Sequence, residues 1–129
     1  MYWAVFYINN YKTHIPVLPA WRCFSPSVLK KWKYDFITIL RARDLEEVFD
    51  ILNNPKYERL HLALQPRAKL IGHTSMSAYD IVVNLQTFES YLCLPVDWLK
   101  VNFEDLPNDL RKKVIVCRVL LEDLVPDIL

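Results

Sequence analysis

The chain has 129 residues, which is a usual length for one domain, and 53% of them are hydrophobic, enough to bury a core rather than remain disordered. Its 16 basic and 15 acidic residues leave a net charge of +1, which excludes a strong overall field that would recruit nucleic acid or an anionic membrane. The single glycine excludes the glycine-rich loops that cradle phosphates in P-loop and dinucleotide-binding proteins, because those loops need several residues without a side chain.

The N-terminal part of the chain is predicted to form two strands and a short helix. Residues 2–8 are mostly aromatic or aliphatic and carry apolar side chains on both faces, as a central strand does. Three prolines make residues 9–26 a packed loop. A serine before Pro26 favours a helix over residues 27–33, and the aliphatic run that follows favours a strand over residues 34–41.

A second helix is predicted to begin at Asp44. The Asp44 carboxylate can accept a hydrogen bond from the amide of Glu47, while the Glu47 side chain reaches back to the amide of Asp44. The next apolar residues recur at the spacing of an amphipathic helix, and they are Leu45, Val48, Phe49 and Leu52. An Asn-Asn-Pro sequence ends this helix at residues 53–55. Alternating leucines favour a short strand between residues 56 and 71.

The second half of the chain favours a hairpin, a further strand and a C-terminal segment. Residues 80–85 and 87–94 are predicted as the strands of the hairpin, and residues 98–103 as the strand that follows. We expect the C-terminal segment to form a helix that begins near Pro107, and the position of its end before Pro126 is left open. Its inner face is expected to carry Leu110, Val114, Cys117, Leu121 and Leu124.

One ambiguity remains in this C-terminal segment, because residues 114–117 are also typical of a strand. With the helix favoured there, the sequence predicts a single α+β domain over residues 1–129. Its architecture is a small, mostly antiparallel sheet with two to three packed helices.

The three cysteines, Cys23, Cys93 and Cys117, are predicted to be free thiols in a reducing compartment. They are odd in number and contain no Cys-x-x-Cys pair, so they indicate neither a disulfide framework nor a zinc site. The apolar N-terminal segment is too short for a signal peptide, and no apolar stretch approaches the roughly 18 residues that span a bilayer. We therefore expect a cytoplasmic protein without a membrane segment.

The only glycine lies beside a cluster of small hydroxyl side chains, which is typical of a tight turn. The residues assigned to this structural turn are Gly72, His73, Ser75, Ser77 and Asp80. A histidine, a serine and an aspartate are also the residue types of a hydrolytic triad, but no nucleophile-elbow sequence surrounds either serine. A structural turn is therefore favoured, and no catalytic residue is assigned. The histidines are too far apart in sequence for a helical metal site, so neither a metal nor a cofactor is expected.

This turn also carries a family resemblance. A pattern of Gly-His-Ser-Leu-Ser, a small spacer and Asp-Val-Val is matched by residues 72–77 and 80–82. Further similarities are the helix opening at residues 44–48 and, on the later strands, Tyr91, Cys93 and Trp98. Over about residues 44–101 the chain thus resembles the YodL-like domains of bacterial mobile elements and phage-associated proteins.

The resemblance implies a compact, non-enzymatic module that binds another protein, as an adaptor or inhibitor, in conflicts between mobile elements and their hosts. It implies no catalytic residues. We expect Trp21 and Phe24, in the proline-rich segment, to be displayed for a partner.

The alternative function is nucleic-acid binding. Lys31 and Trp32 belong to a basic and aromatic group at residues 30–34, where lysines can meet phosphates while rings stack on bases. A second basic group lies at residues 111–113. Both Lys31 and Trp32 are therefore candidate partner-binding residues, and homo-oligomer formation is left open by the sequence.

Overall fold

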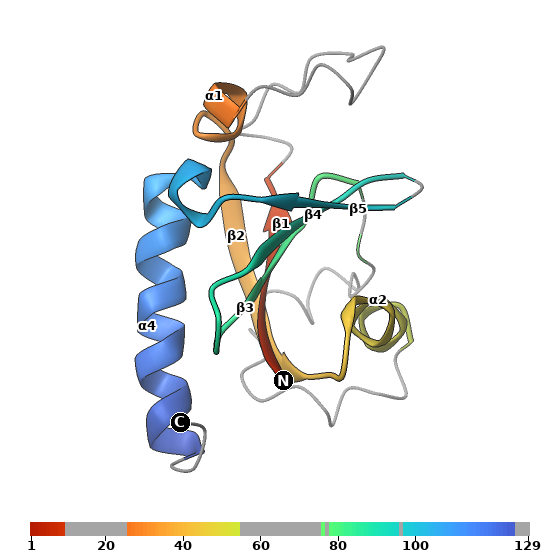
Figure 1. Ribbon diagram of the computed structural model, residues 1–129, viewed down its shortest axis with the longest axis vertical. Helices are drawn as coiled ribbons and strands as arrows, with labels where there is room; N and C mark the ends of the chain where they lie inside the picture. Colours follow the sequence, from red (N-terminus) through yellow and green to blue (C-terminus); the bar gives the residue numbers. More distant parts are fainter. Residues whose placement is uncertain (10–25, 55–75, 77, 96, 126–129) are drawn as a thin grey trace.

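The computed structural model describes residues 1–9, 26–54, 76, 78–95 and 97–125. Its strands form one antiparallel sheet in the order β2-β1-β3-β4-β5 (Figure 1). The strands are β1 (Tyr2–Ile8), β2 (Tyr34–Arg41), β3 (Ile81–Asn84), β4 (Ser90–Cys93) and β5 (Trp98–Val101). The helices are α1 (Pro26–Leu29), α2 (Leu45–Leu52), the 3-10 helix η3 (Phe103–Asp105) and α4 (Asn108–Leu124). The predicted α+β class is therefore confirmed.

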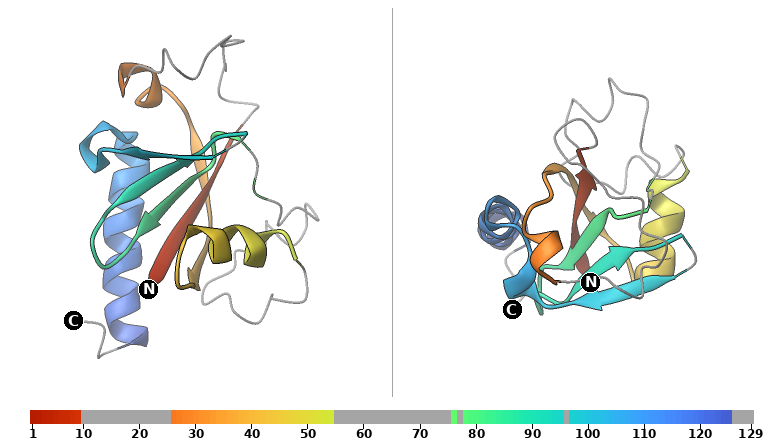
Figure 2. Two further views of the ribbon diagram at one scale, coloured as in Figure 1. Left: turned by 45° about the vertical axis from the view of Figure 1, so that its right-hand side comes forward. Right: turned by 90° about the horizontal axis from the view of Figure 1, so that it is seen from above.

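The two main helices cover opposite faces of the sheet. The view from above in Figure 2 shows the sheet between α4 on one side and α2 on the other. Ala4, Phe6 and Ile8 of β1 belong to the hydrophobic cluster that contains the inner face of α4. Trp3 and Val5 belong to the cluster on the α2 side. Because β1 lies between β2 and β3 and is buried on both faces, its prediction as a central strand is confirmed.

α2 begins as predicted, and its inner face differs from the prediction at Phe49. The Asp44 side chain accepts from the amide of Glu47 at 2.9 Å, as the sequence indicated. The Glu47 side chain does not return to the Asp44 amide, because it accepts from Nε of Arg43 at 2.6 Å, a stronger charge-assisted bond. Phe49, expected on the inner face, is 45% exposed, while Ile51 is buried in its place.

α4 shows that residues 114–117 are helical. Its buried inner row consists of Leu110, Val114, Cys117 and Leu121. Leu124 was expected in the same row and is 52% exposed, since the last turn of α4 extends past the end of the sheet (Figure 1). Arg118 ties the helix to the β3–β4 connection, because its Nη1 donates to the carbonyl of Leu85 at 3.2 Å.

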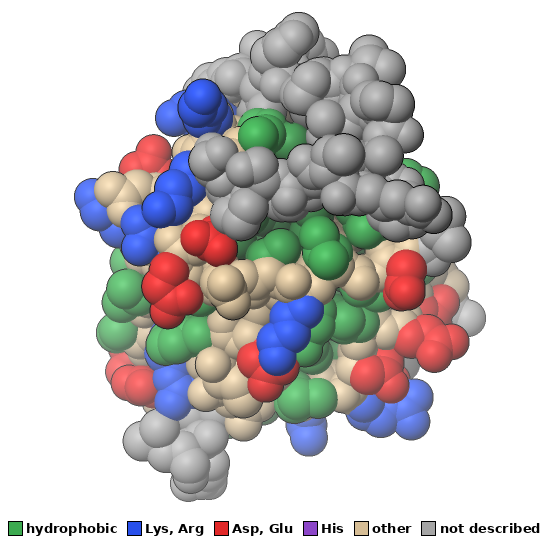
Figure 3. Space-filling view, turned by 45° about the horizontal axis from the view of Figure 1, so that its top comes forward, with side chains coloured by type: hydrophobic (Ala, Val, Ile, Leu, Met, Phe, Trp, Pro, Cys, Tyr) green, Lys and Arg blue, Asp and Glu red, His purple; other side chains and the backbone are tan. Residues whose placement is uncertain are grey.

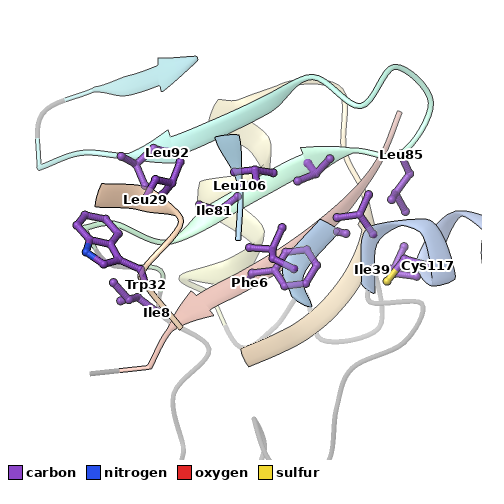
Figure 4. Packing of buried hydrophobic residues seen from close by; sticks show 14 of the residues in the cluster. Phe6, Ile8, Leu29, Trp32, Ile39, Ile81, Leu85, Leu92, Leu106 and Cys117 are labelled. Carbon is purple, nitrogen blue, oxygen red and sulfur yellow. The ribbon is translucent and has the colours of Figure 1, made fainter. Parts of the chain in front are cut away.

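Trp32 is part of the core. The helix predicted over residues 27–33 ends at Leu29, and a turn follows in which the Trp32 amide donates to the Leu29 carbonyl at 3.1 Å. This turn directs the indole inward, beside Leu29 and Ile8 (Figure 4), and its exposed fraction is 2%. The ring meets Tyr79 edge to face at 5.4 Å. The prediction that Trp32 contacts a partner or stacks on bases is therefore wrong.

The predicted hairpin is confirmed, with Ile81 opposite Leu92 in the β3–β4 pair. The next strand is shorter than predicted, because it ends at Val101 and the chain turns into η3. The loop predicted over residues 9–26 lies mostly outside the described residues, as does the strand predicted between residues 56 and 71.

Replacing Trp32 with alanine is expected to lower the free energy of unfolding by about 3–5 kcal/mol, because it leaves a large cavity in the core. The neighbouring Lys31→Ala change should stay within about 0.5 kcal/mol, since its side chain is exposed. Chemical denaturation of both variants beside the wild type measures these differences. A Trp32→Ala variant as stable as the wild type would place the ring on the surface and contradict the packing in Figure 4.

Candidate functional site

The outer face of α4 is the most apolar exposed surface among the described residues. Among the described residues, eight large hydrophobic side chains are exposed, and five of them are on α4. Their exposed fractions run from 41% to 56%, and they are Ile115, Val116, Val119, Leu120 and Leu124. Hydrophobic side chains reach the surface at the left-hand edge of Figure 3, the side on which α4 lies in Figure 1. We call Ile115, Val116, Val119 and Leu120 the α4 outer patch.

The position of the α4 outer patch follows from the packing of the inner row on the sheet. Residues of an α-helix advance by 100° each, so Val114, Cys117 and Leu121 share the side that meets the sheet. Val119 lies on the opposite side, with Ile115 and Val116 flanking it. Packing on the sheet therefore uses one side of α4 and leaves a second apolar side uncovered by any described residue.

Charged residues stand at both ends of the α4 outer patch. Lys112 precedes it and Asp123 follows it, and both are exposed. Two other charges near them are engaged within the chain: Lys113 lies over the ring of Phe36 at 5.0 Å, and Glu122 pairs with Arg118 at 3.2 Å. The patch thus has a basic end and an acidic end.

Asp80 is the member of the predicted turn that the structure describes, and it is buried, with an exposed fraction of 1%. Its Oδ1 accepts from the backbone amide of Ile8 at 2.8 Å, so it joins the end of β1 to the start of β3. Its carbonyl accepts from the amide of Cys93 at 2.8 Å. These bonds agree with a structural role for Asp80, which holds two strands and the end of a third together.

Tyr79, next to Asp80, adopts a backbone conformation that is costly for a residue with a side chain. Its φ is 75°, in the left-handed region that favours glycine. The Tyr34 hydroxyl donates to the Tyr79 carbonyl at 2.7 Å, and the Tyr79 ring packs on Trp32. These contacts hold the strained residue in place, which fixes the approach of the chain to Asp80.

Burial around Asp80 disfavours ionisation of the neighbouring tyrosine and cysteine side chains. Burial, followed by the charge of Asp80, raises the pKa of Tyr7 and of Tyr34 above the ordinary tyrosine value. The same two causes raise the pKa of the Cys93 thiol from 9.0 to about 11. Burial likewise raises the pKa of Cys117 to about 11. Both thiols are protonated at neutral pH and are therefore weak nucleophiles.

Most of the other predicted site residues lie outside the described part of the chain. These are Trp21, Phe24, Gly72, His73, Ser75 and Ser77. Lys31 is exposed, as a partner-binding residue must be, whereas its neighbour Trp32 is buried. Of the predicted contact residues, the structure thus describes Lys31 on the surface and Trp32 in the core.

The first basic group lies beside the start of α4. A groove there is lined by Lys30 and Lys33 and by Asn108 and Asp109 at the start of α4. The groove also contains carboxylates, from Asp35 and Asp109, so its charge is mixed.

Within the described ranges, no three Asp, Glu, Cys or His side chains lie close enough to hold a metal ion. No helix there combines the length and apolar character needed to cross a membrane. Comparisons of the chain with protein-family models, curated proteins and solved structures find no match. The resemblance to YodL-like domains thus stays a prediction.

Sequence reasoning missed the α4 outer patch, although the signal is present in the sequence. Ile115, Val116, Val119 and Leu120 recur at i, i+1, i+4 and i+5, which is one side of a helix. The inner row by itself predicts the helix, whereas the second apolar side becomes apparent only when the remaining residues are placed around the helix axis.

Removal of the Asp80 carboxylate is expected to destabilise the fold. Asp80→Ala leaves the buried amide of Ile8 without its acceptor, which costs about 1–3 kcal/mol of unfolding free energy. Asp80→Asn keeps an acceptor oxygen and should lose less. Equal stability of the wild type and the alanine variant in denaturant titrations would show that the bond to Ile8 contributes nothing.

Alkaline pH is expected to destabilise the fold through its buried thiols. The Cys93 and Cys117 thiols ionise near 9.0 in the unfolded chain but near 11 in the folded one. The stability contributed by these two thiols is therefore complete below pH 9 and falls as the pH rises towards 11, since the unfolded chain releases its protons first. Tyr7 and Tyr34, whose pKa values are raised above 10.0, add to the fall above pH 10 in every variant. Unfolding free energies measured across this range should fall less steeply in Cys117→Ala, which lacks one of these groups. An identical slope in the two proteins would exclude Cys117 as a cause.

Proposed function

We propose that the chain is a non-enzymatic domain that acts by binding protein, and that the α4 outer patch is its contact surface. The observation that carries this proposal is the concentration of exposed aliphatic side chains on one side of a single helix. Contiguous apolar surface that is rimmed by charges marks protein-interaction sites in soluble proteins. The protonated state of Cys93 and Cys117 gives no support to a thiol-based reaction.

The resemblance to YodL-like domains supplies the biological setting of the proposal. An adaptor or inhibitor in conflicts between mobile elements and hosts works by occupying a protein surface, and it needs no catalytic group. We propose the same role for this chain, in the cytoplasm and without a cofactor.

Nucleic-acid binding is the second candidate, and the groove between α1 and α4 favours it. Lys30 and Lys33 stand there beside the start of the helix that carries Arg111 and Lys112. Such binding would weaken steeply with salt, because phosphate contacts release counterions. Trp32 and Tyr34 also line this groove, but Trp32 is only 2% exposed and offers little ring surface on which a base could stack. A mobility-shift titration at physiological salt tests it, and the first proposal expects no shift.

Replacing Val119 with lysine should abolish protein binding while leaving the fold intact. In the complex, the lysine charge in the middle of the patch must lose its hydration, which is unfavourable. In the unbound protein the same charge can pair with Asp123, one helical turn away. The readout is the yield of cross-links to protein that a photoreactive amino acid at position 115 forms. We expect this yield to fall at least about tenfold relative to the same label in the otherwise wild-type chain, with little change in melting temperature.

The matched control is Phe49→Lys, which places the same charge at a similarly exposed hydrophobic position on α2. It should leave the cross-link yield unchanged. Cross-links to protein that persist in Val119→Lys, or a complete absence of protein cross-links from position 115 in the wild type, would contradict the assignment of the contact surface.

A further inference from the structure

We propose that the α4 outer patch binds α4 of a second copy of this chain, with the two helices antiparallel. This inference rests on the proposed function, because it names the partner at the same surface. It is carried by four residues that form one row along the outside of α4: Lys112, Val116, Val119 and Asp123.

The row is symmetrical in its spacing. Its steps of four, three and four residues keep all four side chains within about 60° of one another around the helix, on the side opposite the inner row. The spacing is the same when it is followed in either direction. A twofold axis between Cys117 and Arg118 would therefore place Lys112 of one copy opposite Asp123 of the other, and Val116 opposite Val119. Such self-complementarity is what an isologous dimer interface requires.

The charges select the antiparallel orientation. In a parallel pair, Lys112 would face Lys112 and Asp123 would face Asp123, which is repulsive at both ends. In the antiparallel pair both ends become attractive. Within the described part of the chain neither side chain has an ion-pair partner, so both are available to a second molecule.

The apolar middle of the row supplies the driving force. Val116 and Val119 are 55% and 56% exposed, and Ile115 and Leu120 flank them. A helix of 17 residues is about 25 Å long, so one helix pair buries less than the roughly 800 Å² per partner of a standard interface. We therefore expect a dimer that dissociates on dilution through the micromolar range.

A charge exchange between two variants tests the orientation. Lys112→Glu and Asp123→Lys each turn both attractive contacts of the dimer into repulsions. Both changes also suit the helix dipole, with acid near the N-terminus and base near the C-terminus, so the fold should be retained. In sedimentation velocity each variant alone should show a dissociation constant at least about tenfold above the wild-type value. An equimolar mixture of the two should recover dimers, because both contacts are again between opposite charges.

The control is Asp50→Lys, an identical substitution in the last turn of α2 on the other side of the sheet, which should dimerise like the wild type. A wild-type chain that remains monomeric at millimolar concentration overturns the second copy as partner. The broader protein-binding proposal would survive that result if cross-links from position 115 reached a different protein. Undiminished dimers in either charge variant, or a mixture that stays monomeric, overturn the antiparallel arrangement.

Discussion

The burial of β1 on both faces is the constraint on which the rest of the structure depends. A strand with apolar side chains on both sides cannot leave either side in water, so the sheet needs a covering layer on each face. α2 covers one face and α4 the other (Figure 1). Asp80 fixes the position of β3 relative to the end of β1, because its buried carboxylate accepts a hydrogen bond from the amide of Ile8. The positions of both helices, and therefore of every outer surface, follow from this central strand.

The same constraint explains why α4 has two apolar sides. Its inner row is used in covering the sheet, and Arg118 holds the helix against the β3–β4 connection. Nothing in that packing requires Val116 or Val119 to be aliphatic, because both point away from the sheet. Exposed β-branched residues in a helix contribute little to its own stability. Their presence beside oppositely charged ends is accounted for by an interface.

Elements that depend on local pattern could be predicted from the sequence. The apolar run of β1, the Asp44 cap of α2 and the inner row of α4 each follow from residues adjacent in the chain or one turn apart. The errors arose where a turn decides the direction of a side chain. Trp32 lies among lysines, a pattern typical of a surface residue, but the turn after Leu29 points it into the core. Phe49 is the converse case, since the rotation of α2 on the sheet is set by Trp3 and other distant contacts.

A distance between two copies of α4 tests the central claim most directly. A nitroxide-bearing amino acid at the exposed position 108 lies near one end of the helix, so antiparallel helices hold the two labels far apart. At 1.5 Å per residue along the axis and 8–10 Å between helices, double electron–electron resonance should give a distance of about 30 Å. A distance below about 20 Å would indicate parallel helices, and the absence of any dipolar signal at concentrations where the dimer is expected would contradict the interface itself.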